Sequence, residues 1–460
     1  MVTELYYFDI YPKVVPVGKT TRMTIQPLGK QSAFPATIEL EIKPLNDRNF
    51  DFDGREPVPQ LLTLSPDVDG CLRFDYCFDM ESEYFICFPD KLFPRIHPHK
   101  ARMCVYAVLP DLQGRYPYLG DTHVHSTHSD GAQAPDIVAA DYRKQGLDFL
   151  AMTDHHNYMG SMSMIAAYQD VPLNIALIPG EEVHLPHDAA HIISFGATHS
   201  VNFMVQTKRD EVNDRFPGLN LESLPPETWR GDPDAPCYSE EEYERQVWEL
   251  ADELNLPQNG DRFVIASSTW AARRIKEAGG LAVFPHPYWV NNTFSIPPRV
   301  SDVFFAMNEF DAFEVFGGER YLEQNESQLY HYMEARAKGT KLAPVGASDS
   351  HSVYNNADAY IGKTLVLSPK NERAELVESM RAGYCIAVEC ISKEYRLCSS
   401  LRLIRYGRFL MEYYFPLHDE LCVEEGRLMK AYVCGDEHAA VELSRLYGRT
   451  EALIRKYFAI

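Results

Sequence analysis

The pattern of apolar and polar positions changes near residue 115. Before that point apolar residues alternate with polar ones, most clearly over residues 38–42 and 72–78, and shorter runs of the same kind occupy residues 21–25, 84–88 and 105–109. Turn-forming clusters such as SPDVDG separate these runs. Period-two alternation with regular turns is typical of antiparallel strands. We therefore expect residues 1–115 to form a small β-sandwich-like domain, either a packing or oligomerisation module or a ligand-binding accessory domain.

Beyond residue 118 the pattern becomes a short apolar strand, a polar tip and then a helix. Apolar strands are predicted at 149–152, 175–179, 191–197, 281–284, 312–318, 341–345 and from 364, and helices at 135–145, 269–278, 323–338 and 372–382. In a parallel α/β barrel the polar strand ends meet on one face, where active sites are built. The pattern predicts an α/β barrel over residues 116–391. His191 starts its strand instead of following it, which predicts a distorted or reversed strand.

Two further segments do not follow this alternation of strands and helices. Residues 201–260 contain 14 Asp or Glu against 5 Lys or Arg, together with several prolines and a predicted helix over 240–254. This acidic insertion at about 200–262 is either a lid or docking surface, or a solvated excursion. The C-terminal extension, residues 392–460, is predicted to be mainly helical, with an apolar stripe of helical period over 437–457.

Composition narrows the class of protein. A chain of 460 residues with 45% hydrophobic and 24% charged residues predicts a globular protein of two or three domains. The ten cysteines are scattered without a CxxC pair, which favours reduced thiols in the cytoplasm. The first residues, MVTELYYFDIYPK, do not resemble a signal peptide, and no apolar run approaches a membrane span. The net charge of −22 argues against a binder of duplex nucleic acid.

The candidate chemistry is concentrated in residues 121–131, which read DTHVHSTHSDG. His123 and His125 are two positions apart, so that on a strand both imidazoles point to the same side. Asp130 follows in a turn marked by Ser129 and Gly131. Two imidazoles beside a carboxylate are the ligands that a transition metal ion needs.

Similar residues follow the other predicted strands. The full set of candidate catalytic and metal-binding residues is His123, His125, Asp130, His155, Glu182, His191, His286, Asp349 and His351. Six imidazoles, three carboxylates and no thiol suit Zn²⁺, Mn²⁺ or Fe²⁺. Nine ligands are too many for one ion, so we expect two or three divalent ions with a bridging carboxylate or water. Such a centre would generate hydroxide near neutral pH and hold the oxygens of a phosphate.

The order of these motifs resembles that of the polymerase and histidinol phosphatase (PHP) superfamily of metal-dependent phosphoesterases. The matching stretches are DTHVHSTHSDG, AMTDHHN, PGEEVH, HIISFG, AGGLAVFPHP, DAFEVF and GASDSHS, which span about residues 120–390. The resemblance implies a distorted (β/α)7 barrel, preceded here by the β-rich domain and followed by the helical extension. It also implies a trinuclear metal centre.

The resemblance further implies how the ligands divide among the ions. His123 and His125 would join Glu182 and Asp349 at the first metal. Glu182 would bridge to a second metal held by His191 and His286, and Asp130, His155 and His351 would hold the third. The family's G-x-E motif selects Glu182 over Glu181, and Asp154 is expected to orient a ligand histidine.

Other positions bear on the substrate. His128 and His156 are additional imidazoles beside ligands, and either contact the substrate phosphate or are solvated. Gly317-Gly318 stands where relatives carry an asparagine-like residue, which puts one substrate contact in doubt. The flanking domains and the insertion lie outside the family core.

Three functions remain open from sequence. The first is hydrolysis of a phosphate ester, with a small phosphomonoester or a short oligonucleotide end as substrate. The second is a non-phosphate metal hydrolase of amidohydrolase type, and the third is a metal-stabilised scaffold without catalysis. We expect a small phosphorylated substrate and neither a duplex nor a membrane as partner. Association of the chain with copies of itself stays open.

Overall fold

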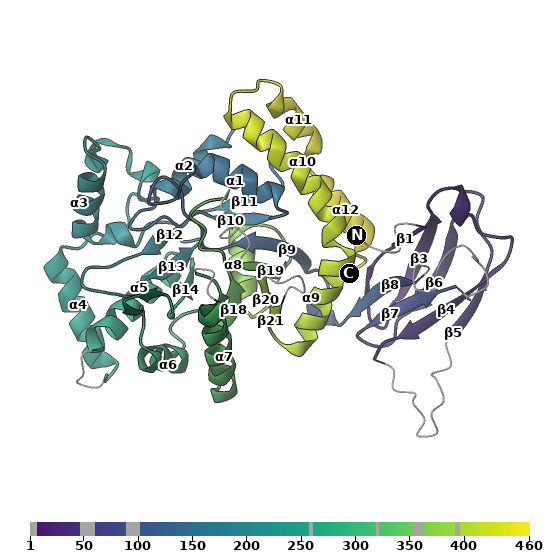
Figure 1. Cartoon of the computed structure of the whole chain (residues 1–460), viewed down its shortest axis with the longest axis horizontal. Helices are drawn as coiled ribbons and strands as arrows, with labels where there is room; N and C mark the ends of the chain where they lie inside the picture. Colours follow the sequence, from purple (N-terminus) through teal and green to yellow (C-terminus); the bar gives the residue numbers. More distant parts are fainter. Residues whose placement is uncertain are drawn as a thin grey trace. The chain divides into compact units, whose positions relative to one another are not determined.

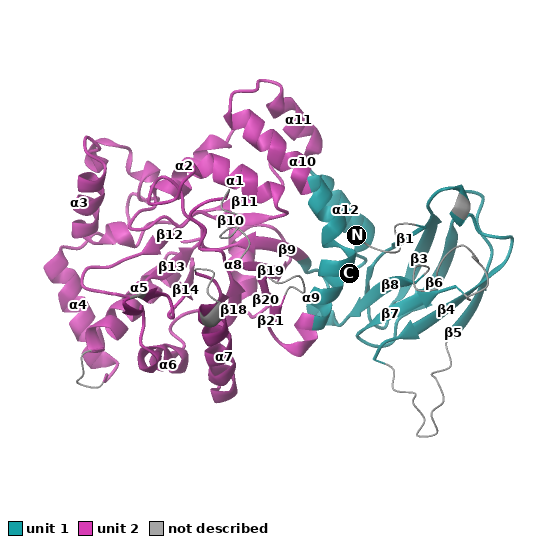
Figure 2. Ribbon diagram, in the orientation of Figure 1, with its two compact units in different colours: residues 1–116, 405–421, 448–460 teal, residues 117–404, 422–447 magenta. Residues whose placement is uncertain are grey.

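The computed structural model describes residues 7–46, 60–88, 102–256, 261–318, 322–353, 362–391 and 396–460. The chain is a mixed α/β protein that forms two compact units (Figures 1 and 2). Unit 1 contains residues 1–116, 405–421 and 448–460, and unit 2 contains residues 117–404 and 422–447. The predicted C-terminal extension is thus divided between the two units. Within the described residues, no helix is long and apolar enough to cross a membrane.

Unit 1 contains two β-sheets that share one apolar core. The smaller sheet has the order β1-β3-β6 and the larger one the order β2-β8-β7-β4-β5. Alternate residues of the strands, such as Ile38, Leu40 and Ile42, are buried in this core, as the period-two pattern predicts. The strands are β1 (Phe8–Tyr11), β2 (Val14–Pro16), β3 (Thr20–Pro27), β4 (Ile38–Pro44), β5 (Gln60–Leu64), β6 (Leu72–Cys77), β7 (Ser82–Cys87) and β8 (Met103–Val108).

Unit 1 is completed by the end of the chain. The Lys13 amide donates to the Tyr457 carbonyl (2.7 Å), the Ala459 amide donates to the Val14 carbonyl (2.9 Å), and the Tyr457 hydroxyl donates to buried Asp9 (3.0 Å). The predicted helical stretch over 437–457 is two helices, α11 (Ala439–Leu446) and α12 (Arg449–Tyr457). The break lies at Gly448, whose φ of +81° is left-handed and interrupts the helical stretch.

Unit 2 contains a six-stranded sheet, β11-β10-β9-β19-β20-β21, and a five-stranded sheet, β12-β13-β14-β17-β18. In the five-stranded sheet β13 runs antiparallel to both neighbours, which confirms the reversed strand predicted at His191. The strands are β9 (Tyr116–Asp121), β10 (Phe149–Ala151), β11 (Ala176–Ile178), β12 (Gly180–Val183), β13 (Ile192–Phe195), β14 (Leu281–Phe284), β17 (Ala312–Phe316), β18 (Ala343–Gly346), β19 (Gly362–Ser368), β20 (Cys385–Glu389) and β21 (Leu397–Cys398), with a small hairpin of β15 (Val290–Asn291) and β16 (Thr293–Phe294).

Isolated parallel bridges join the two sheets of unit 2 beyond the strand ends. Val124 is bridged to Ser350, and His155 to Glu182. The Asp349 amide also donates to the His123 carbonyl (2.9 Å). The segments that carry the predicted ligands are therefore held together by their own backbones.

Helices surround these sheets (Figure 1). Their bounds are α1 (Pro135–Lys144), α2 (Met159–Ala167), α3 (Gln206–Arg215), α4 (Glu240–Glu253), α5 (Arg262–Glu277), α6 (Pro298–Met307), α7 (Leu322–Lys338), α8 (Arg373–Arg381), α9 (Leu401–Tyr413) and α10 (Phe415–Val433). Helix α5 begins seven residues before its predicted start, and α3, within the insertion, was not predicted at all. The sequence of α3, QTKRDEVNDR, has no apolar stripe from which a helix could be recognised.

A buried ion cluster attaches α10 to α1 within unit 2. The guanidinium of Arg143 is fully buried and donates to Glu425 (2.7 Å) and to Asp148 (3.0 Å). Glu425 also accepts from the Asn174 amide (2.7 Å). Buried charges of this kind are stable only as long as each keeps its partners.

We predict that Arg143→Met strongly destabilises the protein. The substitution leaves two buried carboxylates without their arginine, which typically costs about 3–5 kcal/mol. Thermal unfolding followed by circular dichroism should show a melting temperature lower by several degrees. Arg245→Met is the matched control, because Arg245 pairs with Glu242 and Glu249 at the surface, where such pairs contribute about 0–1 kcal/mol. Equal melting temperatures for the two variants would contradict the prediction.

Candidate metal centre

The side chains of His123 and His125 are buried just beyond the end of β9 and point to a common region. Their Nε2 atoms lie 3.2 Å apart, and both lie close to Asp349 Oδ1, at 3.1 and 2.9 Å. The alternation that places residues i and i+2 on one side of a strand accounts for this pairing.

The fully buried carboxylate of Glu182 lies at the centre of the cluster. Its closest neighbours are His191 Nδ1 at 2.6 Å and His155 Nδ1 at 2.7 Å. The other imidazole nitrogens within 4 Å belong to His123 (3.4 Å), His125 (3.4 Å), His286 (3.5 Å) and His184 (3.8 Å). One carboxylate thus faces six imidazoles, which come from the ends of five strands.

Asp130 and His351 lie on another side of His125 and His155. His351 Nε2 is 3.3 Å from Asp130 Oδ1, and His155 Nε2 is 3.6 Å from Asp130 Oδ2. The rings of His125 and His351 are stacked at 4.2 Å. All nine residues predicted as ligands are therefore brought together.

The donor atoms form overlapping groups, each compact enough to hold one ion. Within each group the atoms lie within 4.8 Å of one another, and the groups are His123, His125 and Asp349; His125, Asp130, His155 and His351; His155, Glu182, His184 and His191; and His123, His286 and Glu314. The groups overlap at His123, His125 and His155, so the candidate metal positions lie close to one another.

Electrostatics favour a carboxylate anion amid these imidazoles. Burial would raise the pKa of Glu182, but the imidazoles of His155, His191 and His123 outweigh it and hold the pKa well below its usual range. Burial of His184, reinforced by His191, lowers the pKa of its imidazole well below the usual value. A deprotonated carboxylate beside a neutral imidazole is the state in which both bind a metal ion.

Unsatisfied buried atoms test whether these residues fit metal ions. Neither carboxylate oxygen of Glu182 has a hydrogen-bond partner by geometry, nor do His191 Nδ1 and His286 Nδ1. Buried polar atoms without partners are costly, and cations placed between them would satisfy them. The donor set, imidazole and carboxylate without thiolate, fits Zn²⁺, Mn²⁺ or Fe²⁺.

Two residues of the cluster are absent from the sequence-based set. His184 Nε2 lies 2.9 Å from His155 Nδ1, and Glu314 Oε1 lies 3.0 Å from His123 Nδ1. Glu314 Oε2 also accepts from the His286 amide (3.2 Å). The position of His184, two residues after Glu182, could have identified it. Glu314 lies within the apolar strand β17 and does not follow a strand, so the sequence pattern does not mark it as a candidate.

Two neighbouring carboxylates, Glu181 and Asp154, form hydrogen bonds with serine, asparagine and backbone groups outside the cluster. Glu181 points away from Glu182 and accepts from Ser200 Oγ (2.6 Å), from Asn202 Nδ2 (2.9 Å) and from the Val201 amide. Asp154 accepts from the hydroxyls of Ser126 and Ser129 (both 2.7 Å) and touches no histidine among the described contacts.

Asp154 is nevertheless connected to the candidate ligand His125 through one intervening side chain. The Ser129 hydroxyl that it holds lies 3.4 Å from His125 Nδ1. The predicted orienting contact to a histidine is thus indirect.

The two predicted substrate-contacting histidines differ in their surroundings. The His128 amide donates to Ser126 Oγ (3.1 Å) and its carbonyl accepts from Asn157 (2.8 Å). The ring of His156 lies 4.3 Å from that of His184 and lines a cavity of about 230 Å³ next to His155. Burial, and then the charge of Lys208, lower the pKa of His156 to about 4, so that its ring is neutral.

The backbone of the cluster is strained at several positions. His156, His286 and Asp349 have positive φ angles of 60°, 20° and 51°. Such conformations cost about 1–3 kcal/mol each for non-glycine residues and gather at functional sites.

Gly317 belongs to the same region, because a Cβ there would lie 2.5 Å from the Glu314 carboxylate. Glycine at position 317 therefore leaves room for the Glu314 carboxylate.

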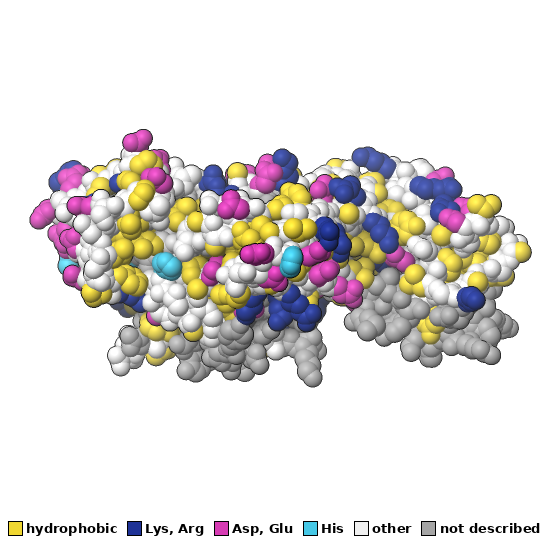
Figure 3. All heavy atoms as spheres, turned by 90° about the horizontal axis from the view of Figure 1, so that it is seen from above, with side chains coloured by type: hydrophobic (Ala, Val, Ile, Leu, Met, Phe, Trp, Pro, Cys, Tyr) yellow, Lys and Arg dark blue, Asp and Glu magenta, His cyan; other side chains and the backbone are white. Residues whose placement is uncertain are grey.

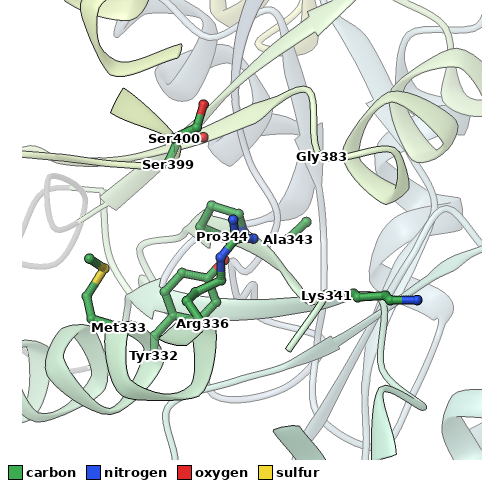
Figure 4. A pocket seen from close by; sticks show the side chains of 9 residues that line it. All are labelled: Tyr332, Met333, Arg336, Lys341, Ala343, Pro344, Gly383, Ser399 and Ser400. Carbon is green, nitrogen blue, oxygen red and sulfur yellow. The ribbon is translucent and has the colours of Figure 1, made fainter. Parts of the chain in front are cut away.

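A second pocket, of about 220 Å³, lies at the other end of β18 (Figure 4). It is lined by Ala343 and Pro344 at the start of that strand, with Tyr332 and Arg336 of α7. Asp349 lies beyond the opposite end of the strand. None of the predicted ligands lines this pocket, and we do not assign the chemistry to it.

Part of the chain is similar to a known protein family, and its fold has similar solved structures. A family model described as the PHP domain matches residues 121–255, and no curated protein matches. Among solved structures, a two-domain protein from Bacteroides vulgatus containing a predicted PHP-like metal-dependent phosphoesterase is 15% identical, with a TM-score of 0.40 over 66% of this chain and 72% of that one. An amidohydrolase from Chromobacterium violaceum with bound sulfate and no metal is 19% identical, with a TM-score of 0.29 over 52% of this chain and 89% of that one.

We predict that Glu314→Gln weakens metal binding without unfolding the protein. The carboxylate contacts His123 on the side of the ring away from Glu182, and loss of such a partner typically lowers metal affinity 10–100-fold. Zinc affinity measured by competition with a chelator should fall by about tenfold. Glu309→Gln, which removes the same charge from a partly exposed pair with Arg273, is the control. Unchanged affinity in Glu314→Gln would exclude this role.

Proposed function

We propose, on the premise that this chain is a PHP-domain protein, that it is a hydrolase that cleaves a phosphate ester with two or three divalent metal ions. The match over residues 121–255 and the cluster of imidazoles and carboxylates support this proposal. The observation that carries it is the buried carboxylate of Glu182, which has no hydrogen-bond partner by geometry and faces six imidazoles.

We interpret the two sheets of unit 2 as one distorted barrel. The bridges Val124–Ser350 and His155–Glu182 would close a ring of seven strands in the order β9, β10, β11–β12, β13, β14, β17 and β18. Strands β11 and β12 count as one, interrupted at Pro179. We likewise interpret the two sheets of unit 1 as a sandwich.

We assign three metal positions. His123, His125, Glu182 and Asp349 would hold the first, and Asp130, His155 and His351 the third. Glu182, His191 and His286 would hold the second, with His184 as a further donor close to Glu182 and His191. The metals in question are Zn²⁺, Mn²⁺ or Fe²⁺.

Bound there, divalent ions would supply an activated water and a Lewis acid for the phosphate oxygens. The protein's own residues would position this chemistry. Glu182 joins the donor groups, Glu314 holds His123 by its far nitrogen, and Asp154 acts on His125 through Ser129. His156 faces the adjacent cavity, where its neutral ring can hydrogen-bond with a substrate.

We further propose a small substrate, or a short oligonucleotide end, in preference to a duplex. On the face shown in Figure 3, acidic and basic side chains of the described residues are interspersed and do not form one basic field. Helix α4 of the insertion carries Glu240, Glu241 and Glu242 in its first turn. A duplex binder needs several Lys or Arg contacts to neighbouring phosphates.

We predict that the protein hydrolyses small aryl phosphates when supplied with Mn²⁺ or Zn²⁺, and loses this activity on chelation. Release of nitrophenol from p-nitrophenyl phosphate should be compared with cleavage of single- and double-stranded oligonucleotides at two salt concentrations. Asp349→Ala, which lacks a proposed ligand, should be inactive. Efficient, strongly salt-dependent duplex cleavage with little aryl phosphatase activity would contradict the choice of substrate. Hydrolysis of an amide or lactone alone would favour an amidohydrolase. The absence of activity in every assay would favour a metal-stabilised scaffold.

We also predict that Glu182→Gln loses at least one of the two or three ions per chain, whereas Glu181→Gln keeps them. Only Glu182 lies among the imidazoles, while Glu181 holds Ser200 and Asn202. Glu181→Gln should instead lower the melting temperature of the protein. The buried carboxylate that accepts hydrogen bonds from Ser200 and Asn202 would be replaced by an amide, which has one accepting oxygen fewer. Elemental analysis of protein purified without chelator gives the metal content of both variants. The reverse order of metal loss would show that the roles of the two residues are exchanged.

A further inference from the structure

The acidic insertion places cationic side chains next to the metal centre. Helix α3, at the start of this insertion, carries Lys208 and Arg215. The α3 pocket is lined by Glu211, Val212 and Arg215 on this helix and by His155, His156 and Asn157 on the facing turn. His155 also belongs to the metal-ligand cluster, so the pocket directly adjoins the place where an ester would react.

The position of α3 is fixed by apolar packing. Val212 is buried in a cluster with Tyr158, Phe203, Leu221 and Trp229, of which Tyr158 directly follows the facing turn. The Arg215 guanidinium donates to the Ser129 carbonyl, next to Asp130. The pocket wall is therefore held on both sides by contacts within unit 2.

Of the charged side chains Lys208, Glu211 and Arg215 at this side of the pocket, the two that form an ion pair leave one cation. Lys208, whose side chain is only 8% exposed, pairs with Glu211 (2.9 Å), so that these two charges cancel. Within the described part of the chain, Arg215 has no carboxylate partner and its only polar contact is the neutral Ser129 carbonyl. His156 Nδ1 is buried in the same region without a hydrogen-bond partner, and its nearest carboxylate oxygen, on Glu211, is 3.8 Å away.

We propose that the α3 pocket binds a second anionic group of the substrate, and that Arg215 determines this specificity. The inference rests on the proposed phosphoesterase function and narrows its substrate class to phosphate esters that carry another carboxylate or phosphate. Arg215 would bind that group by its guanidinium, which suits carboxylate and phosphate oxygens. The unpaired nitrogen of His156 would donate a further hydrogen bond. The net acidity of the insertion elsewhere would disfavour long polyanions while this pocket accepts one additional charge.

Two substrates that differ only in the second anionic group test the proposal. Wild-type protein with Mn²⁺ should turn over 4-carboxyphenyl phosphate with a lower KM than phenyl phosphate. Arg215→Ala should raise the KM for the carboxylated ester about tenfold or more, as expected for a lost hydrogen bond to a charged group, and raise that for phenyl phosphate by a clearly smaller factor. Arg215→Lys should restore part of the preference. Arg245→Ala, which removes the same charge from α4 of the same insertion, should behave like wild type.

A binding measurement without metal separates this proposal from the phosphoesterase function. Calorimetric titration of metal-free protein with inorganic phosphate should show binding that Arg215→Ala weakens about tenfold and Arg245→Ala does not. If neither aryl phosphate is hydrolysed, the phosphoesterase function fails, and the titration still decides whether the pocket holds an anion. Equal losses for both esters in Arg215→Ala, or unchanged KM values and phosphate binding, would overturn the proposal.

Discussion

The structure of unit 2 depends on one electrostatic constraint, which is that the buried carboxylate of Glu182 must be compensated by the groups around it. An isolated carboxylate in the interior is costly, and here six imidazoles from the ends of five strands surround it. Strained backbone at His156, His286 and Asp349 accompanies this convergence. The sheets can be regarded as the frame that holds those imidazoles in place, since apolar strands such as β14 and β17 are buried at every residue.

Polar contacts just outside the cluster connect Glu182 and the imidazoles around it to the surrounding segments. Glu314 reaches His123 and the backbone of His286 at once, and Asn202 donates to Glu181 and to the Glu182 carbonyl while it accepts from the His184 amide. The first residues of the insertion are thereby tied to the strand that carries the central carboxylate. A displacement of the insertion would therefore be felt at Glu182 and His184.

The candidate ligands could be predicted because most of them lie near strand ends, where polarity changes abruptly, and because the spacing of the motifs is distinctive. Glu314 could not, because it lies inside an apolar strand and only the fold places it behind His123. Helix α3 escaped prediction because nine of its ten residues are polar, and its cationic contribution was hidden by the net acidity of the segment around it. The helix break at Gly448 needed the left-handed backbone to be seen, and the assignment of the chain's last residues to unit 1 depends on contacts across the whole sequence.

Unit 1 combines segments that lie far apart in the sequence. Asp9 and Tyr457, which are hydrogen-bonded in unit 1, are 448 positions apart. During synthesis strands β1 and β2 are made long before α12, so their contacts with it can form only after most of the intervening chain has been made. Closing so long a loop costs entropy that grows only slowly with length, and prior folding of the intervening residues 117–404 shortens the flexible path between the ends. Unit 1 is therefore complete only after α12 has been made, although its strands β1–β8 precede unit 2 in the sequence.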